Sequence, residues 1–189
     1  MKKICVFCGS SPGANPAFAK AAGLLGKAIA SRQMELIYGG STLGLMGEVA
    51  RTALKGGARV TGVMPKVFED KVQHPKFVKL HIVDTMHQRK AMMFDLADAF
   101  IALPGGMGTF EEILEMVTWA QIGFHAKPCG ILNICGYYDK LFAFLDNAVE
   151  ERFIRPEHRN MLMCDVNPAG LFEQFSKYKA PKIDKWLDG

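Results

Sequence analysis

Short apolar runs alternate along the chain with longer stretches in which apolar residues recur at helical spacing. In residues 16–30, Phe18, Leu25 and Ile29 lie near one face of a helix, and Pro16 suits its first turn. Apolar runs of strand length occupy residues 4–7, 36–38, 59–63, 80–83, 99–103 and 129–134, with a shorter one around Cys164 and Val166. Helical patterns occupy residues 16–30, 46–54, 86–97, 109–122, 138–151 and 168–175. The hydrophobic pattern therefore predicts strands and helices in nearly regular alternation.

This alternation predicts an α/β fold, because parallel strands need helical connections that cover both faces of a sheet. We expect a Rossmann-like, three-layer, doubly wound architecture with a mainly parallel sheet. No internal repeat or linker interrupts the pattern, so residues 1–180 are predicted to form a single nucleotide-monophosphate-binding domain, followed by a loose tail, 181–189. The charged stretch 66–79, which contains Pro75, is predicted to be a loop with short helical pieces.

Three glycine-rich segments follow predicted strands: Gly9–Gly13, Gly39–Gly47 and Pro104–Thr109. Ligands of open parallel sheets bind at the carboxyl ends of the strands, where glycine lets the backbone approach them and helix N-termini favour anions. A simple turn explains any one segment about equally well, but three at one edge favour a phosphate-bearing ligand. The P-loop pattern is absent, and so is the dinucleotide fingerprint in the first strand–helix turn. A mononucleotide or sugar phosphate therefore fits better than ATP or NAD.

The segment Pro104–Glu112 contains more candidate ligand-binding groups than any other part of the chain. Its three glycines expose backbone amides, and Thr109 can cap the helix that follows, so amides, helix dipole and hydroxyl all favour a bound phosphate. Glu112 has two interpretations. It can complete a capping box with Thr109, or it can act about one helical turn from the phosphate, near a ribose. A capping box does not require the glycines, and their presence favours the second interpretation.

A basic pair, Arg89 and Lys90, stands at the start of the predicted helix 86–97. Such a pair is most often solvated, and the neighbouring His87 is more typical of a surface or capping residue than of a catalyst. The pair nevertheless follows a predicted strand, which brings it to the same edge of the sheet as the glycine-rich segments. We therefore keep both residues as candidates for the ligand site.

Composition narrows the remaining possibilities. Of 189 residues, 49% are hydrophobic and 22% are charged, enough for a buried core. The net charge of +4 weakly favours an anionic ligand, but no basic track suggests nucleic acid. No apolar run suggests a signal peptide or membrane span, and the five cysteines fit reduced thiols in the cytoplasm. Cys5 and Cys8 lie three apart on a strand and point to opposite faces, so we predict packing roles and expect no metal site.

The motifs resemble those of a known family. The segment Pro104–Glu112 reads PGGMGTFEE and is similar to the P-G-G-x-G-T-x-x-E signature of the Lonely guy family. Those proteins are cytokinin riboside 5′-monophosphate phosphoribohydrolases, formerly labelled lysine decarboxylases. The segment 86–90, MHQRK, resembles the second motif of the family, and segments 8–11, 38–40, 44–47 and 118–121 extend the resemblance over nearly the whole chain.

The resemblance implies a site. Arg89 and Glu112 are then the catalytic residues, and the phosphate is held by Gly106, Met107, Gly108 and Thr109. The remaining substrate-binding residues implied are Ser10, Gly40, Lys90, Gly105, Phe110, Glu111 and Thr118. The resemblance further implies a Rossmann-like homodimer that needs no cofactor.

The implied reaction is hydrolysis of the base–ribose bond of a purine nucleoside 5′-monophosphate, of cytokinin type or AMP. Positive charge develops on the ribose, so Glu112 would stabilise it and orient water, while Arg89 would assist the leaving base or hold the phosphate. Two alternatives stay open: a binding module that does not turn its nucleotide over, and a pyridoxal-phosphate decarboxylase, for which the glycine-rich loops offer no obvious Schiff-base lysine.

Overall fold

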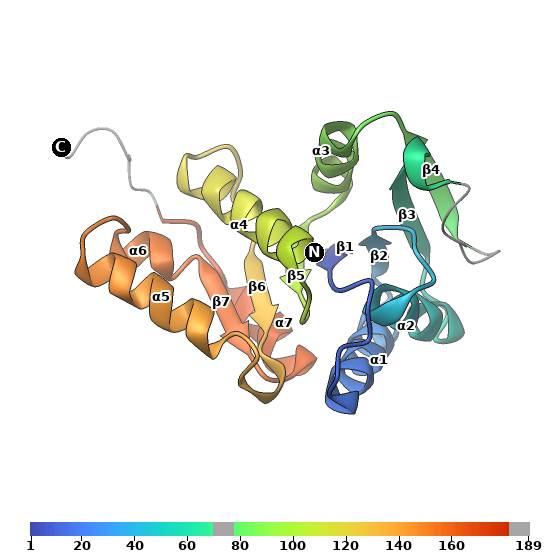
Figure 1. The fold of residues 1–189 in the computed structure, drawn as a ribbon, viewed down its shortest axis with the longest axis horizontal. Coiled ribbons are helices and arrows are strands. Elements are labelled where there is room, and N and C mark those ends of the chain that lie inside the picture. The colour runs from blue at the N-terminus through green and yellow to red at the C-terminus, as the bar shows by residue number, and fades with distance from the viewer. Residues whose placement is uncertain (70–77, 182–189) are drawn as a thin grey trace.

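The computed structural model describes residues 1–69 and 78–181. Seven strands form one sheet in the order β4-β3-β2-β1-β5-β6-β7, and every neighbouring pair is parallel (Figure 1). The strands are β1 (Lys3–Phe7), β2 (Glu35–Tyr38), β3 (Val60–Pro65), β4 (Lys79–Val83), β5 (Ala99–Ala102), β6 (Cys129–Leu132) and β7 (Leu162–Asp165). The predicted Rossmann-like, doubly wound fold is confirmed, and its sheet is parallel throughout.

Helices cover both faces of the sheet. One face packs against α1 (Pro16–Ser31), α2 (Gly44–Lys55) and α7 (Pro168–Lys177). The other packs against α3 (Met86–Leu96), α4 (Met107–Gln121) and α5 (Asp139–Glu150). The short helix α6 (Pro156–Arg159) and the 3-10 turns η1 (Lys66–Phe68) and η2 (Ile134–Gly136) complete the described elements. Within these elements, no helix is both long and apolar enough to cross a membrane.

The central strand shows how the sequence builds two cores. Ile4 and Val6 of β1 belong to the apolar cluster on the α1 face, whereas Cys5 and Phe7 belong to the cluster on the α4 face. Cys8 joins the α1 side, so Cys5 and Cys8 do lie on opposite faces, as their spacing predicts. All five cysteines are free thiols.

The strand order reverses at β1, which has β2 on one side and β5 on the other. Connections leaving the carboxyl ends of these strands turn to opposite faces of the sheet, and the divergence opens a crevice between them. The segment after β1 and the segment after β5 meet there, where the Gly9 amide donates to the Pro104 carbonyl oxygen at 3.0 Å. The topology therefore predicts a ligand site beyond the carboxyl ends of β1 and β5.

Most differences from the predicted elements lie at the ends of those elements. Helix α2 begins at Gly44, which has a positive φ of 55°, and α4 begins at Met107, so each helix starts two residues before its predicted start. The short helix α6 was not predicted. In the stretch 66–79 the predicted helical piece is η1, while 70–77, like the tail residues 182–189, lie outside the described residues.

Candidate active site

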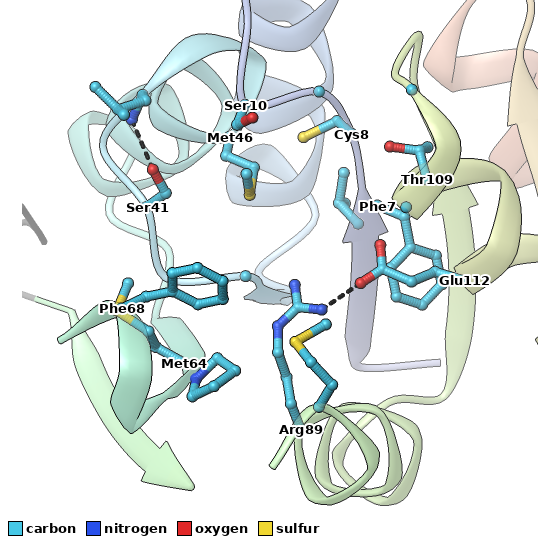
Figure 2. A pocket seen from close by; sticks show the side chains of 18 of the residues that line it. Phe7, Cys8, Ser10, Ser41, Met46, Met64, Phe68, Arg89, Thr109 and Glu112 are labelled. Atoms are coloured by element: carbon cyan, nitrogen blue, oxygen red, sulfur yellow. Dashed lines mark hydrogen bonds and ion pairs between the residues drawn. The ribbon is translucent and has the colours of Figure 1, made fainter. Parts of the chain in front are cut away.

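A cavity of about 580 Å³ opens at the carboxyl edge of the sheet. All three glycine-rich segments line it, together with the end of β3, η1 and the first turn of α3 (Figure 2). Its lining is formed by Val6, Phe7, Cys8, Gly9, Ser10, Gly39, Ser41, Leu43, Met46, Met64, Pro65, Phe68, Met86, Arg89, Gly106, Met107, Gly108, Thr109 and Glu112. The expectation that these segments share one edge is confirmed.

Arg89 reaches the cavity from the first turn of α3. A capping box fixes the start of that helix: the Gln88 amide donates to the Thr85 hydroxyl at 3.1 Å, and the Gln88 side chain accepts from the Thr85 amide. The Arg89 Nε donates to the Val63 carbonyl oxygen of β3 at 3.2 Å. The capped start of α3 and the hydrogen bond to β3 together direct the guanidinium into the cavity. Arg89 as a whole is only 9% exposed.

Gly39 provides the space that this guanidinium occupies. A Cβ atom at position 39 would lie 2.6 Å from Arg89 Nη2 and 2.9 Å from the Met46 sulfur. A side chain here would therefore displace the guanidinium or the end of β2, which explains the need for glycine after this strand.

Glu112 meets Arg89 from the opposite side of the cavity. Its Oε1 accepts a hydrogen bond from Arg89 Nη1, and the two side chains point toward one another from α4 and α3 (Figure 2). Burial raises the pKa of the Glu112 carboxyl above its ordinary value, and the charge of Arg89 opposes that shift. A buried carboxylate whose pKa is displaced by its environment, held against a cation in a cavity, is typical of a catalytic group.

The N-terminus of α4 faces the same cavity. Its cap residue is Gly106, which has no side chain to accept from the amides of the first turn. Thr109 lies inside the helix and makes no capping bond, so the expectation that it caps the helix was wrong, and the alternative interpretation of Glu112 as part of a capping box does not apply. Amides without a capping acceptor, reinforced by the helix dipole, form a ready site for an anion.

Part of the cavity lining is apolar and rich in methionine. It consists of Met46, Met64 and Phe68, which Figure 2 labels, together with Met86 and Met107. Flexible thioethers and an aromatic ring suit a planar, largely apolar group. The cavity thus combines an anion site, a buried ion pair and an apolar wall.

The structure separates the predicted site residues into two groups. Ser10, Arg89, Gly106, Met107, Gly108, Thr109 and Glu112 line the cavity. Gly40, Lys90, Gly105, Phe110, Glu111 and Thr118 are outside its lining.

The outlying residues have other partners. Lys90 pairs with Glu111 and Glu115 of α4, which fastens α3 to α4. Thr118 donates to the Leu114 carbonyl oxygen within α4, at 2.7 Å. It lies nine residues after Thr109, roughly 13 Å along the helix.

Sequence reasoning missed several lining residues, among them Ser41, Met64 and Phe68. Ser41 is buried, and its hydroxyl accepts from the Leu43 amide at 3.0 Å. Met64 is the penultimate residue of β3, and Phe68 lies in the η1 turn that follows that strand. Met64 and Phe68 could have been predicted from the sequence, because the carboxyl end of β3 lies at the same edge of the sheet as the glycine-rich segments.

The chain is a Rossmann-like protein in which a buried Arg–Glu pair lies beside an uncapped helix N-terminus at the switch point of a parallel sheet, an arrangement that can hold an anionic small molecule. The family model described as possible lysine decarboxylase matches residues 46–175. The chain belongs to this family, the Lonely guy family that its motifs resemble.

Curated relatives are similar over nearly the whole chain. A cytokinin riboside 5′-monophosphate phosphoribohydrolase of Arabidopsis thaliana is 46% identical over 97% of this chain and 85% of its own length. A probable cytokinin riboside 5′-monophosphate phosphoribohydrolase of Oryza sativa subsp. japonica is 46% identical over 97% of this chain and 74% of its own length.

Solved structures share the fold at lower identity. A molybdenum cofactor binding protein from Rippkaea orientalis superposes with a TM-score of 0.70 at 23% identity, covering 94% of this chain and 97% of that chain. A Moco carrier protein from Chlamydomonas reinhardtii gives a TM-score of 0.69 at 21% identity, covering 93% and 96%. At such identity the similarity concerns the fold alone.

Proposed function

We propose that the protein hydrolyses the N-glycosidic bond of a purine nucleoside 5′-monophosphate, releasing the free base and ribose 5-phosphate. The buried Arg89–Glu112 pair carries this proposal, because it lies in one cavity with the uncapped amides of α4. The names of relatives 46% identical to this chain support it. The apolar wall suits a purine, with adenine or an N6-substituted cytokinin base as the candidates.

In the proposed mechanism the amides of Gly106, Met107 and Gly108 bind the 5′-phosphate, with the hydroxyls of Ser10 and Thr109 as further ligands. This contact provides binding energy remote from the bond that breaks. Glu112 stabilises the positive charge that develops on the ribose and orients the attacking water, which adds to the anomeric carbon as the bond to the base breaks. Arg89 holds the Glu112 carboxylate and stabilises negative charge on the leaving group.

A pyridoxal-phosphate decarboxylase, which the family description suggests, is less compatible with the site. That chemistry requires a lysine that forms a Schiff base with the cofactor. The described lining of the cavity contains no lysine, and the amino group of Lys90 is committed to Glu111 and Glu115.

We also propose a cytoplasmic homodimer. The free cysteines agree with a reducing compartment. On the face of α5, Phe144 is 66% exposed, and Phe153 beyond that helix is 86% exposed. These two side chains are the candidate dimer contact, and the mass of the protein measured by sedimentation tests the dimer.

The proposal predicts a strict requirement for the phosphate. Purified protein incubated separately with AMP and with isopentenyladenosine monophosphate should release free base, whereas adenosine should give little or none, because it lacks the group that the α4 amides bind. Chromatography of the free base measures all three rates, and the ratio of the first two identifies the preferred base. Binding of AMP without release would instead favour a nucleotide-binding module.

A second prediction concerns the space behind the guanidinium. Gly39→Ala places a methyl group against Arg89 and should lower kcat/KM by roughly ten- to a hundredfold, since a small misplacement of a catalytic group is costly. The control is Gly23→Ala in α1, where the nearest atom to the new Cβ, at 3.0 Å, is the flexible end of Glu48. Equal activity of the two variants would contradict this role of Gly39.

A further inference from the structure

Three consecutive carbonyl groups at the start of the glycine-rich loop after β5 are held from outside that loop. The Leu103 oxygen accepts from the Tyr138 hydroxyl at 2.7 Å, and the Gly105 oxygen accepts from the Tyr137 hydroxyl at 2.6 Å. Between them, the Pro104 oxygen accepts from the Gly9 amide at 3.0 Å. Adjacent tyrosines from one connection therefore bracket the loop on either side of Pro104.

The connection between β6 and α5 is shaped to present both hydroxyls. Cys135 and Gly136 of η2 have positive φ angles of 53° and 70°, which turn the chain sharply before the tyrosines. The Tyr138 amide donates to the Asn133 side chain at 2.8 Å, which closes the turn.

Ring packing holds the two tyrosines in place. Their rings pack edge to face with centroids 4.9 Å apart, and the Tyr137 ring packs on Phe18 of α1 at 5.5 Å. Tyr138 is buried, at 1% exposed, whereas Tyr137 is 42% exposed and its ring is held by its contacts with Tyr138 and Phe18.

The orientation of these carbonyls decides the orientation of the neighbouring amides. In a planar trans peptide the C=O and the following N–H point in opposite directions. Fixing the Gly105 oxygen on Tyr137 therefore directs the Gly106 amide away from Tyr137, and Gly106 lines the cavity. Without the clamp, a glycine-rich loop can rotate a peptide so that a carbonyl dipole faces the anion and repels it.

We propose that Tyr137 and Tyr138 are positioning residues that preorganise the phosphate-binding loop. They lie outside the lining of the cavity and act through the carbonyls of Leu103 and Gly105. The inference rests on the proposed function in one respect only, namely that the anion bound at this loop is the substrate phosphate.

The test removes one hydroxyl and keeps the ring. Tyr137→Phe should raise KM for AMP by about three- to tenfold, the value of one hydrogen bond, and leave kcat within about twofold, because the phosphate contact is the same in ground and transition states. The inhibition constant of ribose 5-phosphate should rise by the same factor, whereas that of free adenine should stay constant. A role in folding alone would not distinguish these two inhibitors.

Tyr38→Phe is the matched control, because the buried Tyr38 hydroxyl has no hydrogen-bond partner among the residues that the structure describes. Tyr138→Phe, measured in the same way, tests the hydrogen bond from the buried tyrosine to the Leu103 carbonyl. Constants for AMP and ribose 5-phosphate in Tyr137→Phe equal to those of Tyr38→Phe would overturn the inference. If the wild-type protein releases no base from any monophosphate, the proposed function fails, and calorimetric titration of the same variants with inorganic phosphate still decides the clamp.

Discussion

Glu112→Gln is expected to abolish most turnover while nucleotide binding persists. The glutamine oxygen can still accept from Arg89, so the cavity keeps its shape, but the amide cannot stabilise a cationic ribose or take a proton from water. We expect kcat to fall by roughly 10²- to 10⁴-fold, the range associated with a positioned acid–base group. Initial rates of base release, together with calorimetric titration with AMP, measure the two effects separately.

Glu115→Gln is the control for this variant. Glu115 lies on the same helix and pairs with Lys90, which retains Glu111 as a partner, and it is outside the lining of the cavity. Its substitution should leave kcat close to that of the wild type. A Glu112→Gln protein that released base at the wild-type rate would remove Glu112 from the chemistry.

Arg89→Ala is expected to combine loss of activity with a large loss of stability. The side chains of Arg89 and Glu112 are 10% and 9% exposed, so removal of the cation leaves a buried carboxylate without its partner. Breaking such a pair costs about 3–5 kcal/mol of the free energy of unfolding. Urea denaturation at neutral pH, alongside base-release assays, measures both effects.

The pH dependence of this destabilisation has a definite sign. Burial already raises the pKa of Glu112, and loss of Arg89 raises it further above the value in the unfolded chain. Protonation then favours the folded variant, so its deficit relative to the wild type is fully present above the folded-state pKa. The part of the deficit that comes from ionised Glu112 shrinks as the pH falls through that pKa and is gone below the unfolded-state value of about 4.3, whereas the loss of the Arg89–Val63 hydrogen bond persists at every pH.

A double variant isolates the interaction between the two residues. Arg89→Ala combined with Glu112→Gln carries no buried charge at this position, so it should be more stable at neutral pH than Arg89→Ala alone. Equal stability of the single and double variants at neutral pH would show that the loss does not come from an unpaired Glu112.

The sequence by itself determined the order of the elements and the edge of the sheet that carries the site. Helical and strand periodicities depend on residues within about one turn of each other, so short-range patterns such as that of α1 predict the element correctly. Glycines after β1, β2 and β5 then meet at one edge, because parallel strands bring their carboxyl ends together. The motif of Pro104–Glu112 added the family to which the chain belongs.

Only the tertiary structure showed that Lys90 and Glu111, the neighbours of Arg89 and Glu112, lie outside the cavity lining. Arg89 and Lys90 are neighbours in α3, as Glu111 and Glu112 are in α4, and each step along a helix turns a side chain by about 100°. Arg89 and Glu112 meet in the cavity, whereas Lys90 and Glu111 pair outside its lining. That choice depends on how each helix is rotated against the sheet, and core packing over the whole domain sets this rotation.

The hydrogen bonds that hold the loop after β5 could likewise not be predicted from the sequence. Tyr137 binds the carbonyl of Gly105 across 32 positions of sequence, and Arg89 binds the carbonyl of Val63 across 26. No local pattern encodes such contacts, because they exist only once β3, β5 and β6 have paired in register and their connections have been brought together. Sequence therefore specified the groups that the site contains, and long-range packing determined their orientation.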